Sequence, residues 1–374
     1  MGGGMFKVAD YLIQSQAAPG DAHPTSAQLL ALDTRGERAA AWSLVVLTLA
    51  IGRLVRGRLG RRLAGVHVNM AERLSLVRKS VVVVTCHALG IPVTLHLHAA
   101  QLHRAWPQLP APLRALVRQV FALPACCIVL GRESAHFVQD ELQVPASRIE
   151  VVINGVPEPA QRAPAPRAVS RDPLRLLFVG NLSARKGVPE LLRALALAPL
   201  ASMPLRLTLA GGGDLAGFRA LAQALGLGDR VHFEGWAEQS RVARLMAESD
   251  VLVLPSHDEG LPLVILEALA CGVPVVCTPV GEIPHLLQDG VHACFVAPGD
   301  VTGLARALAD LLVDRVRRDA LVRNGRALYQ ASFSLPRFFD QIAAIHQRCF
   351  GVAGQLAIDL AAPRATHTPQ EATA

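Results

Sequence analysis

Short apolar segments rich in branched residues alternate with longer segments of helical periodicity from residue 174 to about residue 290. The apolar segments predict strands at residues 174–179, 205–209, 230–233, 251–254 and 273–277. The segments between them predict helices near residues 188–198, 215–226, 238–248 and 262–271. Alternation of this kind predicts βαβ units and a parallel sheet that is covered on both faces. Ligands of such sheets bind at the carboxyl ends of the strands, where Gly180, the glycines at 211–213 and the 258–262 loop fall.

The first half of the chain shows the same alternation less clearly. Its apolar segments predict strands at residues 66–69, 92–98, 125–130 and 149–153. Residues 81–85 stay open, because their composition favours a strand whereas their position before Gly90 favours the end of a helix. We expect a first α/β domain over 1–157, a proline- and arginine-rich linker over 158–173, a second domain over 174–335 and a disordered tail over 354–374.

The amino terminus does not fit a complete doubly wound domain. Such a domain places a central strand before its glycine-rich turn. Here the glycines at 2–4 directly follow Met1, and a helical pattern occupies residues 6–16. The sequence therefore predicts a first domain that lacks its first strand. Either the true start lies further upstream, or the chain is a truncated form.

Length and composition fit two packed domains. A chain of 374 residues is long enough for two cores. Hydrophobic residues make up 51% and charged residues 18%, which argues against a disordered chain. Aromatic residues make up only 4%, so the stacking platforms of a nucleic-acid-binding protein are not expected. The net charge of +7 needs another explanation.

Basic residues concentrate directly after an apolar run at residues 39–52. That run has 14 residues, fewer than the roughly 20 that a spanning helix needs, so no transmembrane segment is predicted. The arginines that follow the run are Arg53, Arg56, Arg58, Arg61 and Arg62. Two interpretations stay open for this segment. It is either an element that lies on a membrane surface or a solvated helix end, and the glycines at 57 and 60 weaken the amphipathic pattern.

Cysteine usage indicates a reducing compartment. The seven cysteines are odd in number, form no Cys-x-x-Cys pair and lie mostly in apolar segments such as PACCIVL (124–130). We expect them to be reduced core residues. The sequence shows no signal-peptide pattern, which together with the cysteines predicts a cytoplasmic protein.

Two carboxylates bracket the start of a predicted helix. Glu267 is the only charged residue of the apolar segment 262–276, so we expect it to be buried there. A buried carboxylate without a partner costs several kcal/mol, and either a distant arginine, backbone amides or a bound ligand must satisfy it. Glu259 lies just before the helix, in a Gly-Leu-Pro turn whose free N–H groups suit an anion or a hydroxyl-rich ligand. The presence of both carboxylates, Glu259 and Glu267, favours a bound ligand over an arginine or backbone amides as the partner.

Glu259 and Glu267, separated by seven residues, resemble the signature of retaining glycosyltransferases with the GT-B fold, especially glycosyltransferase family 4 (glycosyl transferases group 1). The neighbouring segments agree in order and spacing: LLFVGNLSARKG (176–187), LTLAGGGDL (207–215), the 231–260 stretch and GVPVVCTPVGEIPHLLQDG (272–290). The resemblance covers residues 174 to about 350. It implies an α/β fold of two Rossmann-like domains facing across a cleft, a helix over 336–353 that crosses back to the first domain, and a nucleotide-sugar donor. Members generally need no metal, and no cofactor is expected.

The resemblance also implies roles for individual residues. Lys186, helped by Arg185, would neutralise the leaving diphosphate, and Asn181 stands where the family usually has arginine. Glu267 would accept hydrogen bonds from the ribose, and Glu259 would contact hydroxyls of the sugar. The implied donor-binding residues are Asn181, Arg185, Lys186, Gly260, Leu261, Pro262, Leu263 and Glu267, with Gly3 and Gly4 as a phosphate loop. The implied catalytic residues are His98, Lys186 and Glu259.

Histidines end the strand predicted at 92–98. His96 and His98 share one side of that strand, because residues two apart point the same way, and we expect them to face the cleft. By the resemblance, His98 would bond the transferred sugar. A metal pair completed by His103 is the alternative, although no carboxylate or cysteine follows at ligand spacing. Residues 281–285 read GEIPH where the family often reads GGIPE, so His285 departs from the pattern and receives no role.

The expected function is retaining transfer of a hexose-type sugar from a UDP- or GDP-linked donor to a saccharide or lipid-linked saccharide, in cell-surface polysaccharide or glycoconjugate biosynthesis. The basic first half suggests contact with the inner face of the cytoplasmic membrane, and no nucleic-acid partner is expected. Two alternatives remain. One is a nucleotide-sugar epimerase of the same fold. The other is a non-catalytic nucleotide-sugar-binding relative, which Asn181, His285 and the missing strand favour.

Overall fold

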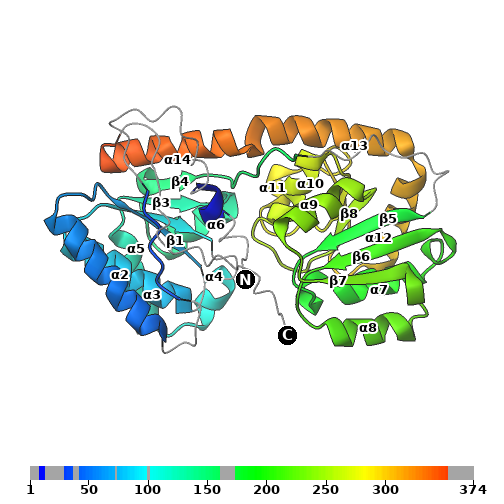
Figure 1. Ribbon diagram of the computed structural model, residues 1–374, viewed down its shortest axis with the longest axis horizontal. Coiled ribbons are helices and arrows are strands. Elements are labelled where there is room, and N and C mark those ends of the chain that lie inside the picture. Colours follow the sequence, from blue (N-terminus) through cyan, green and yellow to red (C-terminus); the bar gives the residue numbers. More distant parts are fainter. Residues whose placement is uncertain are drawn as a thin grey trace, which may run out of the picture.

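The computed structural model describes residues 8–12, 29–36, 42–71, 74–98, 102–160 and 173–352. It consists of two α/β units that lie side by side, each built on a parallel sheet (Figure 1). The helices α13 (Arg315–Leu328) and α14 (Leu335–Phe350) run along one side of both units. The predicted pair of Rossmann-like domains is therefore confirmed. Gly3, Gly4, most of the predicted linker and the predicted tail lie outside the described residues.

The first unit holds a four-stranded parallel sheet in the order β1-β2-β3-β4. Its strands are β1 (Val66–Met70), β2 (Val93–Leu97), β3 (Cys126–Val129) and β4 (Ile149–Val151). Its helices are α2 (Trp42–Leu59), α3 (Leu74–Ala88), α4 (Leu102–Ala105), α5 (Ala111–Ala122) and α6 (Arg132–His136). Residues 81–85 belong to α3, because its buried positions Val82, Val83 and Cys86 follow helical spacing. Among the described residues no strand precedes β1.

The second unit holds a six-stranded parallel sheet in the order β10-β9-β8-β5-β6-β7. Its strands are β5 (Leu174–Val179), β6 (Leu205–Ala210), β7 (Val231–Gly235), β8 (Val251–Leu254), β9 (Val275–Cys277) and β10 (Cys294–Phe295). Its remaining helices are α7 (Val188–Ala196), α8 (Leu215–Ala224), α9 (Gln239–Glu248), α10 (Leu263–Cys271), α11 (Ile283–Leu286) and α12 (Val301–Val313). Chain order reverses between β5 and β8, and a crevice at such a reversal is where doubly wound sheets bind ligands.

Apolar burial explains both sheets. Every residue of β2, β3, β8 and β9 is buried, as expected for parallel strands covered on both faces. All seven cysteines are free and six are buried, which confirms their predicted place in the core.

The basic segment after residue 52 continues α2 to Leu59, through Gly52 and Gly57. None of the helices in the described part of the chain is long and apolar enough to cross a membrane.

Within the described residues, two segments that connect the units, around Val156 and around Phe333, are bonded to each other. The N–H of Val156 donates to the carbonyl of Phe333 at 2.9 Å, and the Tyr329 hydroxyl donates to the carbonyl of Val156 at 3.2 Å. A Cβ on Gly155 would lie 2.7 Å from the Cβ of Phe338, so a glycine is needed for this close approach. From there α14 packs on the first unit through Phe338, Ile342, Ile345 and His346.

Candidate functional site

The carboxyl ends of the two sheets face each other. Arg104, in α4 after β2, forms an ion pair with Asp258, which follows β8; the nitrogen and oxygen are 3.1 Å apart. Ser134, in α6 after β3, bonds Glu282, which follows β9. Because these residues follow strands of both sheets, the space between the units is bordered by the edges where ligands of parallel sheets bind.

Lys186 and Glu259 form the centre of the site on the second unit. The Lys186 ammonium donates to Oε1 of Glu259, and the Ser256 hydroxyl donates to the same oxygen at 2.7 Å. The side chains of Lys186 and Glu259 are only 14% and 7% exposed. Two charges this far out of water are tolerated because they neutralise each other.

Gly187 places Lys186 against the end of β8. Its φ of +70° is left-handed, and a Cβ there would lie 2.0 Å from the carbonyl oxygen of Pro255. Only glycine combines that backbone conformation with that contact. The turn at 184–187 can therefore lie flat on the residues that precede Glu259, which is the local reason for the Lys186-Gly187 sequence.

Arg185 lies at the outer edge of the same turn. Its guanidinium donates to the carbonyl of Asp258 at 2.7 Å, and its own carbonyl accepts from the N–H of His257 at 2.8 Å. Arg185 is exposed, as is Asn181 after β5. The structure thus brings Arg185, Lys186 and Glu259 together, and it leaves Asn181 at the surface of the β5 turn.

Helix α10 begins directly after the Gly260-Leu261-Pro262 turn. Pro262 is its N-cap residue and makes no side-chain cap bond. The first N–H groups of a helix have no partner within the helix and carry partial positive charge. The amino end of α10, with the backbone of Gly260 to Leu263, therefore suits a phosphate or a hydroxyl next to Glu259.

Glu267 lies on the only side of α10 that is not fully buried. Within α10 just Val264 and Glu267, three residues apart, are partly exposed. The prediction of a buried Glu267 is therefore wrong in degree, because one helix face remains open. Tyr11 lies near this face: burial, and then the charge of Glu267, raise the pKa of its phenol. The Gln239 amide donates to the Tyr11 oxygen at 2.7 Å, which holds the segment 8–12 against the second unit.

The histidines of the first unit occupy a different environment from the one predicted. His96 and His98 do share one side, with ring centroids 4.1 Å apart. His96, however, is fully buried, 6.4 Å from the ring of Phe338 in α14, and so does not line the cleft. His98 is partly exposed and its Nε2 lies 3.0 Å from Oδ1 of Asn69. Its bonding partner thus belongs to its own unit.

The alternative of a metal site finds no geometric support. The ring of His103 lies against Phe137, with centroids 6.4 Å apart. Across the described residues, no group of three or more His, Cys, Asp or Glu side chains is arranged to hold a metal ion. The pair His96 and His98 packs as rings within the unit.

Sequence reasoning missed three polar residues of this region. Ser256 is fully buried under Glu259, Asp258 is 4% exposed at the interface, and Glu282 is 2% exposed between the units. The signal for Ser256 and Asp258 was their position at the carboxyl end of β8. Glu282 had no local signal, because its partner Ser134 is 148 residues away.

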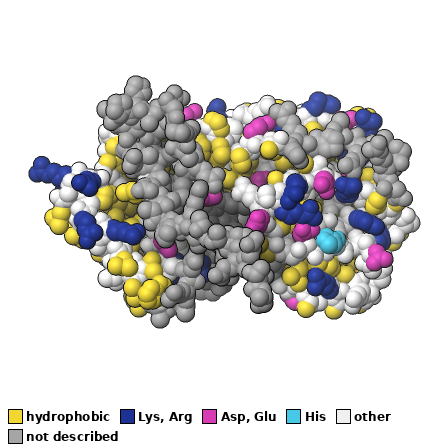
Figure 2. Space-filling model, in the orientation of Figure 1, with side chains coloured by type: hydrophobic (Ala, Val, Ile, Leu, Met, Phe, Trp, Pro, Cys, Tyr) yellow, Lys and Arg dark blue, Asp and Glu magenta, His cyan; other side chains and the backbone are white. Residues whose placement is uncertain are grey.

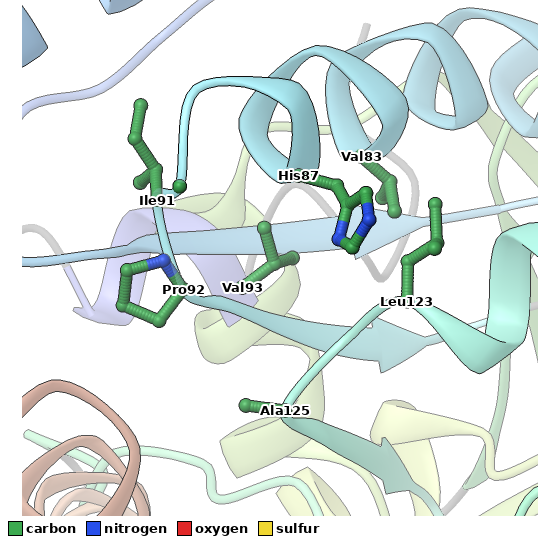
Figure 3. Close-up of a pocket in the computed structure, with 8 residues that line it drawn as sticks. Val83, His87, Ile91, Pro92, Val93, Leu123 and Ala125 are labelled. Atoms are coloured by element: carbon green, nitrogen blue, oxygen red, sulfur yellow. The ribbon is translucent and has the colours of Figure 1, made fainter.

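A shallow apolar pocket of about 360 Å³ lies elsewhere (Figure 3). Its lining comes from the end of α3 and the amino ends of β2 and β3, and consists of Val83, His87, Gly90, Ile91, Pro92, Val93, Leu123 and Ala125. It therefore lies at the sheet edge opposite to the one that faces the second unit. With His87 as its only titratable side chain, the pocket does not share the chemistry of the Lys186 region.

Comparison with known proteins agrees with this geometry. Residues 161–328 match the family described as glycosyl transferases group 1. The chain is 33% identical over 236 residues to a protein named D-inositol 3-phosphate glycosyltransferase from Mycobacterium sp. (strain KMS), covering 60% of this chain and 52% of that protein. The chain thus spans about half the length of the curated relatives it matches.

Two solved structures show the same fold. Sucrose-phosphate synthase from Thermosynechococcus elongatus superposes with a TM-score of 0.71 at 20% identity, covering 93% of each chain. HepE from Anabaena, in complex with UDP-glucose, gives a TM-score of 0.66 at 22% identity, covering 80% of this chain and 82% of HepE. Both neighbours have the two-domain GT-B architecture. Residues 161–328 therefore form a glycosyl transferases group 1 domain, within a chain that has the GT-B fold.

Proposed function

We propose that this protein is a retaining glycosyltransferase that moves a hexose-type sugar from a UDP- or GDP-linked donor to a saccharide or lipid-linked saccharide acceptor, for cell-surface polysaccharide or glycoconjugate synthesis. One observation carries the proposal: a buried Lys186–Glu259 pair lies beside the uncapped amino end of α10. This cluster falls within the group 1 domain, at the sheet edge where the chain order reverses.

Lys186 can stabilise the negative charge that develops on a departing nucleoside diphosphate. When the bond between the anomeric carbon and the diphosphate oxygen breaks, negative charge develops on that oxygen. A preorganised cation with backbone N–H groups stabilises such charge by several kcal/mol. Lys186 is held by Glu259, Arg185 adds a second cation at the outer edge, and α10 begins four residues after Glu259 without a side-chain cap.

Glu259 binds hydroxyls of the donor sugar and does not act as a nucleophile. Its Oε1 already accepts from Lys186 and Ser256, which fixes the carboxylate and lowers its nucleophilicity. A double displacement needs a carboxylate free to attack the anomeric carbon. We therefore favour front-face transfer, in which the leaving phosphate takes the proton of the acceptor hydroxyl and the sugar keeps its configuration.

The remaining roles follow from position. Glu267, on the open face of α10, accepts hydrogen bonds from the ribose hydroxyls. His98, held by Asn69, contacts the transferred sugar from the first unit. No metal takes part, because Lys186 and Arg185 supply the positive charge.

A panel of donors tests this function. UDP-glucose, which HepE binds in its complex, UDP-galactose and GDP-mannose are each incubated with the protein, and nucleoside diphosphate release and nucleotide affinity are both measured. The acceptors are a lipid-linked saccharide and inositol 3-phosphate, the latter suggested by the name of the relatives. Transfer with retained anomeric configuration supports the proposal. Binding without turnover on every acceptor favours a non-catalytic binding protein, and no binding to any donor overturns both.

Membrane contact is a second part of the proposal. The outward side of α2 carries Trp42, Leu44, Val45 and Leu49, which are 43–67% exposed, and α2 and α3 contain basic residues without a single Asp or Glu. Figure 2 shows hydrophobic side chains gathered at the lower end of the first unit and Lys or Arg side chains at its outer margin. Apolar side chains on a helix that also carries arginines fit an anionic bilayer surface, at the inner face of the cytoplasmic membrane.

Vesicle sedimentation tests this surface. The protein should sediment with phosphatidylglycerol vesicles and much less with phosphatidylcholine vesicles, and Leu44→Glu should release it. The matched control is Val316→Glu, at an equally exposed apolar position on α13 of the second unit. Equal sedimentation of both variants, or none for the parent protein, would contradict membrane contact through α2.

A further inference from the structure

Glu282 is a buried carboxylate whose side-chain bonds cross from one unit to the other. Its Oε1 accepts from the N–H of Ser134 at 3.1 Å and from the Ser134 hydroxyl at 3.2 Å. Glu282 itself is only 2% exposed. Hydrogen bonds to a charged acceptor are the stronger kind. These two are therefore a substantial link between the second unit and α6 of the first.

Gly131 provides the space that Glu282 occupies. A Cβ on Gly131 would lie 2.1 Å from both Cδ and Oε2 of Glu282. The φ of Gly131 is 176°, an extended conformation open to any residue, so the glycine is needed for space alone. The side chain of one unit thus fits a slot in the backbone of the other.

The second oxygen of Glu282 makes this link reversible. Oε2 is buried and has no hydrogen-bond partner among the residues that the structure describes. Opening the units would return this oxygen to water, which offsets part of what the two Ser134 bonds contribute. A contact in which two hydrogen bonds are partly offset by one buried, unbonded oxygen can both form and break.

The backbone of Glu282 also touches the candidate site. Its N–H donates to the carbonyl of Gly260 at 3.0 Å. The preceding Gly281 has φ +57°, and a Cβ there would lie 2.1 Å from the carbonyl oxygen of Glu259. The 281–282 turn therefore rests on the backbone of residues 259 and 260, which carries the partner of Lys186.

Two further contacts between the sheet edges are more exposed to solvent. Arg104 is 56% exposed in its pair with Asp258. His285 and Glu133 lie 3.6 Å apart and are 39% and 55% exposed. Exposed ion pairs contribute little. Among these contacts, Glu282 with Ser134 is the one shielded from water.

We propose that Glu282 is a positioning residue that couples closure of the two units to the placement of Glu259 and Lys186. In the closed arrangement Ser134 and the Gly131 slot fix the Glu282 side chain, and its backbone holds the 259–260 turn. When the units open, the Glu282 side chain loses its contacts with the first unit, so the 281–282 turn that supports residues 259 and 260 is no longer fixed from that side. The coupling to turnover rests on the proposed glycosyltransferase function, whereas the link between the units does not.

The test compares four variants by small-angle scattering and by donor turnover. Glu282→Ala removes the link, and Gly131→Ala fills the slot. Glu282→Gln keeps an acceptor oxygen for Ser134 at the same size. Glu133→Ala is the matched control, because it breaks only the exposed pair with His285. Nucleotide affinity and the thermal midpoint are measured for each.

We expect Glu282→Ala and Gly131→Ala to increase the radius of gyration and to lower kcat about tenfold or more, with nucleotide affinity within about twofold of the parent, since two charge-assisted bonds are lost away from the nucleotide. Glu282→Gln should lie between the parent and Glu282→Ala, because it keeps an acceptor for Ser134 but loses the charge, and Glu133→Ala should match the parent. An unchanged radius of gyration in Glu282→Ala overturns the proposal, and so does a Glu282→Gln variant as impaired as Glu282→Ala. If Gly131→Ala fails to fold, Glu282→Ala decides alone. A parent protein without turnover on any donor would refute the proposed function, while scattering still tests the link.

Discussion

Acidification should weaken the packing of α14 on the first unit. Four histidines share the space between β1, β2 and α14: His67, His96, His98 and His346. Nδ1 of His67 lies 2.8 Å from Nε2 of His346, and within the described part of the chain neither nitrogen of His96 has a hydrogen-bond partner. Burial lowers the pKa of His67 to about 4 and that of His346 to about 2, and it holds the pKa of His96 well below its usual value.

The sign and size of the effect follow from linkage. A histidine whose folded pKa lies below its unfolded value of about 6.5 binds its proton more readily in the unfolded chain, so stability is complete above that pH and falls as the pH drops. His96 and His346 are 0% and 1% exposed. Each should cost about 1.3 kcal/mol between pH of about 7.5 and about 5.5, or roughly 3 kcal/mol together. Burial also places the pKa of His67, about 4, and that of His98, about 3, below this pH range, so both contribute in the same direction, and the loss continues until the pH reaches the folded pKa values.

Urea unfolding at the two pH values measures this loss. Trp106 is the reporter, because it is 2% exposed in the first unit, and Trp42 and Trp236, at 44% and 64%, are replaced by phenylalanine. His346→Phe should remove the share that His346 contributes, about 1.3 kcal/mol, and His96→Leu with His346→Phe should remove about twice that. The reasoning is refuted if the parent is equally stable at both pH values, or if the double variant keeps the full slope.

Four further predictions concern the site and its supports. Lys186→Ala should lower turnover about a hundredfold or more with little change in donor KM; turnover within threefold of the parent would remove Lys186 from the mechanism. Glu267→Ala should weaken nucleotide-sugar binding about tenfold or more in calorimetry, because bonds to a charged acceptor are lost, and unchanged affinity would contradict the ribose contact. Exhaustive treatment with a chelator should leave the transfer rate unchanged, and a loss that a divalent ion restores would show a metal requirement. Gly187→Ala should destabilise the protein by roughly 3 kcal/mol or more, because the strain of a left-handed backbone adds to a 2.0 Å contact with the carbonyl oxygen of Pro255. The control Gly226→Ala, at φ +67° with nothing within 4 Å, should cost only about 1–2 kcal/mol. Equal thermal midpoints for the two variants would show that the contact with Pro255 has no effect.

The strands β5 to β9 of the second unit were predictable to within about two residues, because a buried strand is recognisable from the apolar residues of its own segment. A strand such as β8, whose four residues are all apolar and buried, can be located from its own sequence. Residues 81–85 were ambiguous for the same reason, since branched apolar residues fit either a strand or a buried helix face. β10 pairs over two residues only and leaves no periodic signal.

Long-range contacts explain what the sequence left out of the site. The motif around Glu259 locates the turn but does not show that Lys186, 73 residues earlier, bonds its carboxylate. The partial exposure of Glu267 depends on how α10 meets its neighbours, among them the segment that holds Tyr11. His96 was expected at the cleft because strand alternation places it on the same face of the sheet as His98. Alternation does not show that α14 covers His96 on that face.

The bonded passages at Val156 and Phe333 limit how the molecule can move. A single flexible connection would let the two units tumble independently, whereas two parallel connections that are bonded to each other resist torsion about their common direction. Bending at this point remains as the soft coordinate. Domain opening should therefore be mainly a bending motion at Val156 and Phe333, and a distance measured between the units should report on it.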